Sequence, residues 1–252
     1  MTDFIAAAHR ALACLDLTNL DDDCDAAAVD ALCARAVTAH GSVAAICIWP
    51  RFVAHARARL APDVKIATVV NFPSGTEPDE DVIAMTEQAL ADGADEIDMV
   101  IAWHSLLEGG DQEVQARVER VKRAAGASRI KAILETGMLE DPALIRRAAH
   151  LALAGGADFI KTSTGKVPIN ATLAAADIML EVLHEVDPTR GFKPAGGIRS
   201  TRDAVNYLLR ADRVMGEGWA DPQHFRIGAS SALTALIATL DGTADPDEAE
   251  GY

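Results

Sequence analysis

One pattern occurs twice in this sequence, as Ala91-Asp-Gly-Ala-Asp-Glu-Ile-Asp98 and as Ala154-Gly-Gly-Ala-Asp-Phe-Ile-Lys161, at an offset of 63 residues. Each copy joins the end of a helical pattern, through glycine, to the start of an apolar run. Half of this offset matches one strand-and-helix unit of about 30 residues. Lys193 follows Lys161 after nearly the same interval. The spacing therefore predicts a regular alternation of strands and helices.

Short apolar runs recur along the chain between segments with apolar residues at helical spacing. The predicted strands are Val43–Ile48, Ile66–Asn71, Ala94–Ile101, Ile130–Glu135, Asp158–Thr162, Gly191–Lys193, Arg213–Met215 and Phe225–Gly228. Asp141-Pro142 and Ser200 with Asp203 have the residue types that begin helices. Eight runs interleaved with helices in 252 residues predict a (β/α)8 barrel. A doubly wound open sheet is the alternative, but no G-x-G-x-x-G motif follows the first run.

We expect one barrel domain over residues 1–240, with a helical extension before its first strand. Residues 241–252 are acidic and include glycine and proline, so they predict a flexible tail. The run Asp21-Asp22-Asp23 is expected in a solvated loop or at a helix start.

Composition restricts the class of protein. The chain has 38 acidic against 23 basic residues, a net charge of −15, and 50% hydrophobic residues. Half apolar is too hydrophobic for a disordered chain, and a nucleic-acid partner is not expected because a phosphate backbone needs a basic face. Any phosphate must therefore be bound in a small local cationic pocket. Only six of the 23 basic residues are lysines, so their positions are informative.

Cysteine spacing and the N-terminal residues predict the compartment. The four cysteines, Cys14, Cys24, Cys33 and Cys47, form no C-x-x-C pair and have no histidines at zinc spacing, so we expect free thiols and no metal. The N-terminal segment has an acidic residue where a signal peptide needs a basic one, and no stretch approaches the roughly 20 apolar residues of a membrane span. We expect a cytoplasmic protein with no membrane partner.

Three charged residues are expected inside the barrel. Side chains alternate along strands, so Asp98 and Lys161 point inward near the C-terminal mouth, within reach of Lys193 on the next strand. Two ammonium groups about 5 Å apart repel by roughly 3 kcal/mol at an effective dielectric constant of about 20, or about two pKa units. One lysine would then be a nucleophilic amine able to form a Schiff base, with Asp98 transferring protons. A lysine that reaches the rim or pairs with a carboxylate is the structural alternative.

Glycine-rich stretches after three strands favour a phosphate site. They are Thr162-Ser-Thr-Gly165-Lys166, Gly196-Gly197-Ile-Arg199 and Gly228-Ala-Ser230-Ser231. Glycine lets backbone N–H groups approach an anion, and barrels commonly bind phosphate in their last loops. Each stretch alone is a weak signal, but Lys166 and Arg199 add positive charge.

A longer set of motifs resembles the deoxyribose-phosphate aldolase family. It comprises Leu15-Asp-Leu-Thr18, Ala45-Ile-Cys-Ile-Trp-Pro-Arg-Phe52, Thr68-Val-Val-Asn-Phe-Pro73, Gly93-Ala-Asp-Glu-Ile-Asp98, Glu135-Thr-Gly137, Phe159-Ile-Lys-Thr-Ser-Thr-Gly-Lys166, Gly191-Phe-Lys-Pro-Ala-Gly-Gly-Ile-Arg199, Gly228-Ala-Ser-Ser231 and a terminal Tyr. The resemblance implies a class I aldolase on a (β/α)8 barrel, without metal or other cofactor. Such an enzyme interconverts 2-deoxy-D-ribose 5-phosphate with acetaldehyde and D-glyceraldehyde 3-phosphate.

The resemblance also implies residue roles. Lys161 would be the Schiff-base lysine, Lys193 the second lysine that perturbs it, and Asp98 and Tyr252 members of the proton relay. The substrate hydroxyls would be bound by Asp16, Thr18 and Lys166. The phosphate would be bound by Gly165, Gly196, Gly197, Arg199, Ser230 and Ser231. Small phosphosugars and aldehydes are the expected partners, and a homodimer is the expected assembly.

Several points stay open at the level of sequence. Trp103-His104-Ser105 stands where the family carries Pro-Tyr-Arg, which leaves the substrate range undecided. Cys47 is either a buried inert thiol or one reachable from the site, and Glu135 is either a structural residue or a site carboxylate. A phosphosugar isomerase and a non-catalytic phosphosugar-binding barrel remain the functional alternatives.

Overall fold

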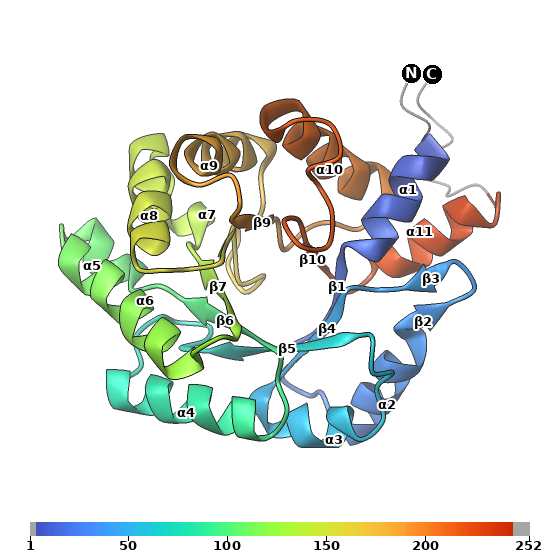
Figure 1. Cartoon of the computed structure of the whole chain (residues 1–252), viewed down its shortest axis with the longest axis horizontal. Coiled ribbons are helices and arrows are strands. Elements are labelled where there is room, and N and C mark those ends of the chain that lie inside the picture. The colour runs from blue at the N-terminus through green and yellow to red at the C-terminus, as the bar shows by residue number, and fades with distance from the viewer. Residues whose placement is uncertain (1–3, 244–252) are drawn as a thin grey trace.

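The computed structural model describes residues 4–243 and contains a closed ring of parallel strands surrounded by helices (Figure 1). Neighbouring strands follow the order β10-β1-β4-β5-β6-β7-β8-β9. Two isolated parallel bridges, Phe192–Phe225 and Ala195–Gly228, join the ends of this order and close the ring. The predicted (β/α)8 barrel is confirmed. Tyr252 and the part of the predicted tail from residue 244 onward lie outside the described residues.

The strands of the barrel are short, and most of their residues are buried on both faces. They are β1 (Leu15–Asn19), β4 (Ala45–Ile48), β5 (Lys65–Val70), β6 (Glu96–Val100), β7 (Arg129–Ile133), β8 (Phe159–Lys161), β9 (Gly191–Lys193) and β10 (Ile227–Ala229). A small hairpin of β2 (Val37–Thr38) and β3 (Gly41–Ser42) lies between β1 and β4 in the chain. Parallel strands of this kind need helices over their outer faces.

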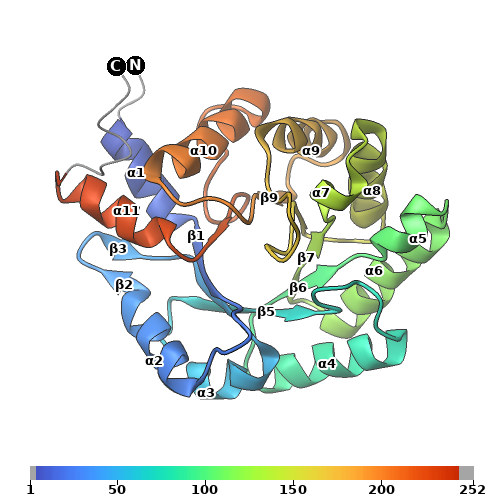
Figure 2. The same ribbon diagram turned by 180° about the vertical axis from the view of Figure 1, so that it is seen from behind.

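Helices cover the outside of the ring in both views (Figures 1 and 2). They are α1 (Phe4–Ala13), α2 (Ala26–Arg35), α3 (Val53–Arg57), α4 (Asp79–Ala91), α5 (Trp103–Leu107), α6 (Asp111–Ala125), α7 (Thr136–Leu139), α8 (Pro142–Ala154), α9 (Leu173–Val186), α10 (Thr201–Met215) and α11 (Ala232–Leu240), with a 3-10 turn at Pro50–Phe52. The predicted N-terminal extension is α1, which packs between α10 and α11. Among the described residues, no helix is both long and apolar enough to cross a membrane.

Two of the strand predictions need correction. Arg213–Met215 is the last turn of α10, because the buried positions Leu208 and Ala211 continue the helical spacing up to it. The missing strand is β1, in which the buried charge of Asp16 interrupts an otherwise apolar run. The predicted run from Phe225 begins too early, since β10 starts at Ile227.

Helix ends follow the sequence signals closely. Asp141 caps α8 by accepting a hydrogen bond from the Ala143 N–H, with Pro142 as the first helical residue. Ser200 and Asp203 form a reciprocal capping box at α10. Both caps satisfy N–H groups that a helix leaves without a partner.

The strand register brings charged side chains together inside the barrel. Asp98 on β6 pairs with Lys131 on β7, and Lys161 on β8 pairs with Lys193 on β9. Paired residues of neighbouring strands project from the same face of a sheet. All four are nearly or fully buried, so the interior of this barrel is occupied by charge where aliphatic side chains are usual.

Candidate active site

Asp98 lies at the centre of three lysines. Its Oδ2 atom accepts hydrogen bonds from the Nζ atoms of Lys161 and Lys193, each at 2.8 Å. Its Oδ1 atom accepts a third from Lys131 Nζ, also at 2.8 Å. The structure thus brings together the three residues that the strand alternation placed inward, and it adds Lys131.

Sequence reasoning missed Lys131, although the signal was present. It is one of six lysines in the chain and stands second in the run Ile130–Ile133, between apolar residues. It contacts three carboxylates, those of Asp98 at 2.8 Å, Glu96 at 2.6 Å and Asp16 at 3.4 Å. Although burial opposes it, these carboxylates raise the pKa of Lys131, so its amine is held as an ammonium ion.

Lys161 and Lys193 differ in the number of carboxylates that support their charge. Within the described residues Lys161 pairs with Asp98 alone, whereas Lys193 pairs with Asp98 and, at 2.5 Å, with Asp16. Burial lowers the pKa of Lys161 by more than the Asp98 carboxylate raises it, and the Lys193 ammonium ion adds a further, smaller lowering. For Lys193 burial also acts downward, but Asp16 and Asp98 together raise its pKa. Lys161 is therefore the lysine that gives up a proton most readily.

The main cause of the lowered pKa of Lys161 differs from the one expected from the sequence, which was repulsion by Lys193. Repulsion between two ammonium groups does lower the pKa of Lys161, but burial is the larger cause. Asp98 lies between the two lysines and screens them from each other. Although burial opposes it, Lys131 first and then the other two lysines hold the pKa of Asp98 well below its ordinary value, so it is a carboxylate.

A cavity of about 230 Å³ opens above Lys161 at the C-terminal mouth of the barrel. Predicted site residues that line it are Thr18, Lys161, Gly165, Lys166, Gly196, Gly197, Arg199, Ser230 and Ser231. Asp98 and Lys193 are not among its lining residues and are fully buried. The nucleophile candidate thus meets solvent at the top, and its charged partners lie out of solvent.

One end of this cavity has the form of an anion site. Gly165, Gly196 and Gly197 have φ values of +87°, +85° and +82°, which side chains other than glycine rarely adopt. The loop with Gly196 and Gly197 leads into the N-terminal end of α10, and the loop that ends at Ser231 leads into that of α11, where backbone N–H groups lack helical partners. Arg199 and Ser231 are exposed beside these ends.

The three residues expected at the substrate hydroxyls lie at different depths. Asp16 is fully buried, outside the cavity lining, and its oxygens accept hydrogen bonds from Lys193 and Arg226. Thr18 lines the cavity and donates to the Asp16 carbonyl oxygen at 2.8 Å. Lys166 lines it as well, with its Nζ atom 3.3 Å from exposed Asp22.

Glu135 holds the loop that follows β8. It is fully buried at a φ of +55°, and its Oε1 atom accepts a hydrogen bond from the Thr164 N–H at 3.2 Å. Burial raises the pKa of this carboxyl group above its ordinary value. Thr164 lines the cavity and Glu135 does not, so this hydrogen bond supports the cavity wall from behind, which favours a structural role.

The other two open residues also have defined places. Cys47 is fully buried on β4, outside the cavity lining, and burial raises the pKa of its thiol. His104 stacks on Trp103, with ring centroids 3.4 Å apart, at the start of α5. Neither lines the cavity.

A sequence profile of the DeoC/LacD family of aldolases matches residues 10–231. The chain belongs to the DeoC/LacD aldolase family. Over 249 residues it is 51% identical to the deoxyribose-phosphate aldolase of Agrobacterium fabrum, an alignment that covers 98% of this chain and 96% of that protein.

Solved structures agree with membership of the DeoC/LacD family. A crystal structure of a Toxoplasma gondii protein assigned as a deoxyribose-phosphate aldolase has a TM-score of 0.85 and 27% identity, covering 95% of this chain and 94% of that chain. A tetrameric deoxyribose phosphate aldolase from Aeropyrum pernix shares the fold, with a TM-score of 0.74 and 24% identity over 94% of this chain and 97% of that one. As a DeoC/LacD aldolase, the protein is a lyase acting on a carbon–carbon bond beside a carbonyl group.

Proposed function

We propose that this aldolase cleaves 2-deoxy-D-ribose 5-phosphate reversibly, using Lys161 as the Schiff-base nucleophile. The observation that carries the proposal is the position of Lys161, a buried lysine of lowered pKa that lines a cavity with glycine-rich loops at its other end. The 51% identity to the Agrobacterium fabrum enzyme supports the substrate. The products are D-glyceraldehyde 3-phosphate and acetaldehyde.

The reaction needs an amine and two proton transfers. The free amine of Lys161 attacks the C1 carbonyl of the open-chain sugar, and uptake of one proton with loss of water leaves an iminium ion. A base removes the C3 hydroxyl proton, the C2–C3 electron pair moves toward the iminium nitrogen, and D-glyceraldehyde 3-phosphate leaves. A proton then adds to the enamine carbon, and water hydrolyses the iminium ion to acetaldehyde and the free amine.

The buried partners of Lys161 suit these proton transfers. Asp98 Oδ2 accepts from both Lys161 and Lys193, so it offers a path between the two nitrogens. The raised pKa of Lys193 makes it the proton reservoir of the pair. Tyr252 keeps its proposed role in protonating the enamine carbon, and its removal is expected to slow solvent exchange of the acetaldehyde methyl protons.

Substrate binding is assigned to the cavity wall and its base. Thr18 and Lys166 bind the sugar hydroxyls, and Asp16 acts with them through Lys193. The phosphate is bound by Gly165, Gly196, Gly197, Arg199, Ser230 and Ser231. A positive φ at each of these three glycines and two helix N-terminal ends support this assignment.

Borohydride reduction in the presence of acetaldehyde tests the nucleophile. We expect one ethyl group to be added per chain, and peptide mapping to place it on Lys161. Lys161→Leu should take up no label, whereas Lys122→Leu, which removes an ion pair with Asp158 on the outside of the barrel, should be labelled normally. An ethyl group on another residue, or none, would contradict the mechanism.

We propose a homodimer in the cytoplasm, handling small phosphosugars and aldehydes. Sedimentation velocity at micromolar concentration distinguishes the dimer from a monomer and from a tetramer like that of the Aeropyrum pernix relative.

A further inference from the structure

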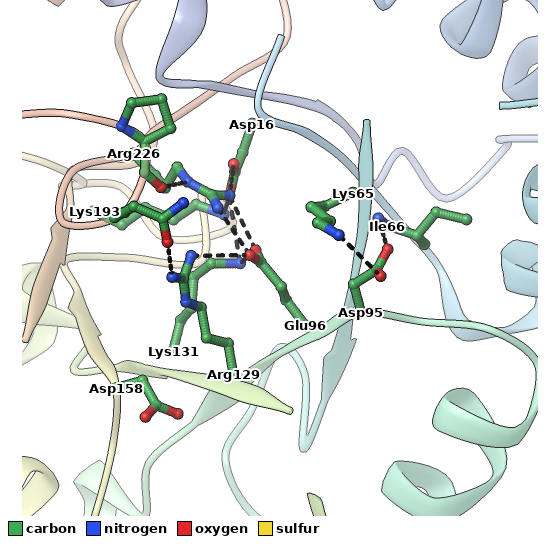
Figure 3. A network of polar contacts seen from close by, with 12 residues as sticks. Asp16, Lys65, Ile66, Asp95, Glu96, Arg129, Lys131, Asp158, Lys193 and Arg226 are labelled. Carbon is green, nitrogen blue, oxygen red and sulfur yellow. Dashed lines mark hydrogen bonds and ion pairs between the residues drawn. The ribbon is translucent and has the colours of Figure 1, made fainter. Parts of the chain in front are cut away.

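Arg226 lies beneath the proposed active site, inside the barrel. It precedes β10 and is 3% exposed. Its Nη1 atom donates to Asp16 Oδ1 at 2.8 Å and to Glu96 Oε2 at 3.0 Å, and Nη2 donates to Glu96 Oε1 at 2.8 Å. Its Nε atom donates to the Pro222 carbonyl oxygen at 2.7 Å. Figure 3 shows Arg226 between the two carboxylates, fixed by four hydrogen bonds.

Both carboxylates that Arg226 binds also contact the lysines above it. Glu96 accepts from Lys131 at 2.6 Å, and Asp16 accepts from Lys193 at 2.5 Å. Lys131 and Lys193 in turn bind Asp98, the one carboxylate paired with Lys161 in the described part of the chain. Arg226 is therefore linked to Lys161 by four successive ion pairs, through a carboxylate, a lysine and Asp98.

We define the buried charge network as the ionisable residues that these contacts join, each at most 3% exposed in the described chain: Asp16, Glu96, Asp98, Lys131, Lys161, Lys193 and Arg226. With every group ionised, four cations meet three carboxylates, so one positive charge is in excess. A buried excess charge is costly, and losing a proton removes it. Arginine keeps its proton in proteins, so a lysine must lose one.

The excess falls on the lysine with the fewest carboxylates. Lys131 contacts three, Lys193 contacts two, and Lys161 contacts one within residues 4–243. Resting on the proposed role of Lys161, we propose that Arg226 is a positioning residue that keeps the Lys161 amine unprotonated. It does so by neutralising Glu96 and Asp16 from below, which leaves no spare carboxylate to compensate a Lys161 ammonium ion.

The other ionisable groups around Arg226 and Lys161 do not alter this balance. Burial raises the pKa of Cys14 to about 12, and it also raises the pKa of Cys47, so both thiols are neutral. Burial also raises the pKa of Glu135, and among the described residues its Oε1 atom accepts from the Thr164 N–H and not from a lysine of the network. Arg129 lies 3.5 Å from Glu96, but its side chain is 29% exposed and its charge is screened by water.

The test is the pH dependence of Lys161 labelling by acetaldehyde and borohydride. Labelling falls at low pH as Lys161 becomes protonated, and we call this side of the pH profile the acid limb. Arg226→Met removes a cation, so Lys161 should hold its proton more tightly and the acid limb should move up by about one pH unit. Labelling at pH 7 should then fall by up to about tenfold, and recover at higher pH. Glu96→Gln removes a carboxylate and should move the limb the other way.

The double variant Arg226→Met with Glu96→Gln separates charge balance from structure. It restores a single excess cation, so its acid limb should return toward that of the wild type. A structural role for Arg226 would instead make the double variant at least as impaired as either single variant, with an unmoved limb. That result would overturn the proposal.

Two further variants guard against misfolding. Arg226→Lys keeps the charge and should keep the position of the limb, even at lower stability. Arg10→Met breaks a partly buried ion pair with Asp212 outside the barrel interior, and should leave the limb unmoved. If the wild type itself is not labelled on Lys161, the proposed function fails; if it is labelled but Arg226→Met and Arg226→Lys have the same limb, this inference alone fails.

Discussion

Asp98 accepts hydrogen bonds from three lysine side chains with two oxygen atoms, and this sharing decides what each lysine variant does. Lys161 and Lys193 bind the same oxygen, Oδ2, so the loss of either leaves that atom to the other. Lys131 binds Oδ1 and stays in place. A change at one lysine therefore changes the proton affinity of its neighbour.

Lys193→Leu is expected to slow Schiff-base formation strongly at pH 7. Without Lys193, Asp98 supports Lys161 alone at Oδ2 and Asp16 loses its closest cation, so the pKa of Lys161 rises toward its ordinary value of about 10.4. The deficit should therefore shrink as the pH is raised from 7 to 10. Lys65→Leu, at an exposed lysine on the opposite mouth, is the matched control. A deficit of equal size at every pH would mean that Lys193 acts by proton transfer rather than by charge.

At this scale, sequence alone predicted part of the cluster. Alternation placed Asp98 and Lys161 inward, within reach of Lys193, and the structure brings these three side chains together. Lys131 and Arg226 were missed because the height of a side chain in the barrel depends on the stagger between strands, which the sequence of one strand does not contain. Arg226 also lies just before its strand.

Among the elements, α7 packs tightly against the loop that carries Gly165 and Lys166. A Cβ atom on Gly137 would lie 1.8 Å from the Ile169 carbonyl oxygen, which is backbone and cannot turn aside. The same loop is tied to α7 by the hydrogen bond from the Thr136 N–H to the Thr162 carbonyl oxygen at 2.9 Å. The loop and α7 therefore move together.

Gly137→Ala is expected to raise KM for the phosphosugar while acetaldehyde labelling of Lys161 is largely kept. The added methyl group pushes the loop outward, at a cost of about 1–3 kcal/mol in the free energy of unfolding. Gly155→Ala would place its Cβ atom 2.7 Å from Val118 Cβ, a milder clash between α6 and α8 away from the cavity, and is the control for lost stability. An equal rise in KM in both variants would trace the effect to stability.

Helices were easier to predict than strands at this scale. The ends of α8 and α10 follow from caps that act within four residues, so local sequence contains them. β1 pairs with β4 and β10, which are distant in the chain. The charge of Asp16 within it is neutralised by Lys193 and Arg226, which are distant as well. β1 is thus stabilised by contacts with distant residues, and a search for apolar runs in the sequence did not identify it.

For the whole molecule, the buried charge network predicts how stability depends on pH. Although burial opposes them, neighbouring cations lower the pKa of Asp16, Glu96 and Asp98 in the folded state. Groups with lowered pKa values stabilise the fold above their unfolded pKa of about 4, and this contribution is lost as the pH falls through the folded values. The free energy of unfolding should therefore decline steeply below about pH 4.

Urea unfolding followed by circular dichroism between pH 2 and 7 measures this decline. Asp98→Asn removes one of the three carboxylates, so its curve should be lower at pH 7 and flatter in acid. Asp63→Asn changes an exposed carboxylate and should follow the wild-type slope. Parallel curves for all three proteins would show that the network does not set the acid limit.

The joint between β9 and β10 is held by two isolated bridges, whereas the other neighbouring strands share continuous ladders. Four backbone hydrogen bonds cross this joint without forming a continuous ladder, so we expect its amide hydrogens to exchange with solvent sooner than those of the ladders. The cavity lies over this joint, with Gly196 and Gly197 on one side and Ser230 and Ser231 on the other. A phosphate bound by residues on both sides would link β9 to β10. We therefore expect substrate to slow deuterium uptake most at the amides of this joint, because the bound ligand would itself stabilise the closed barrel.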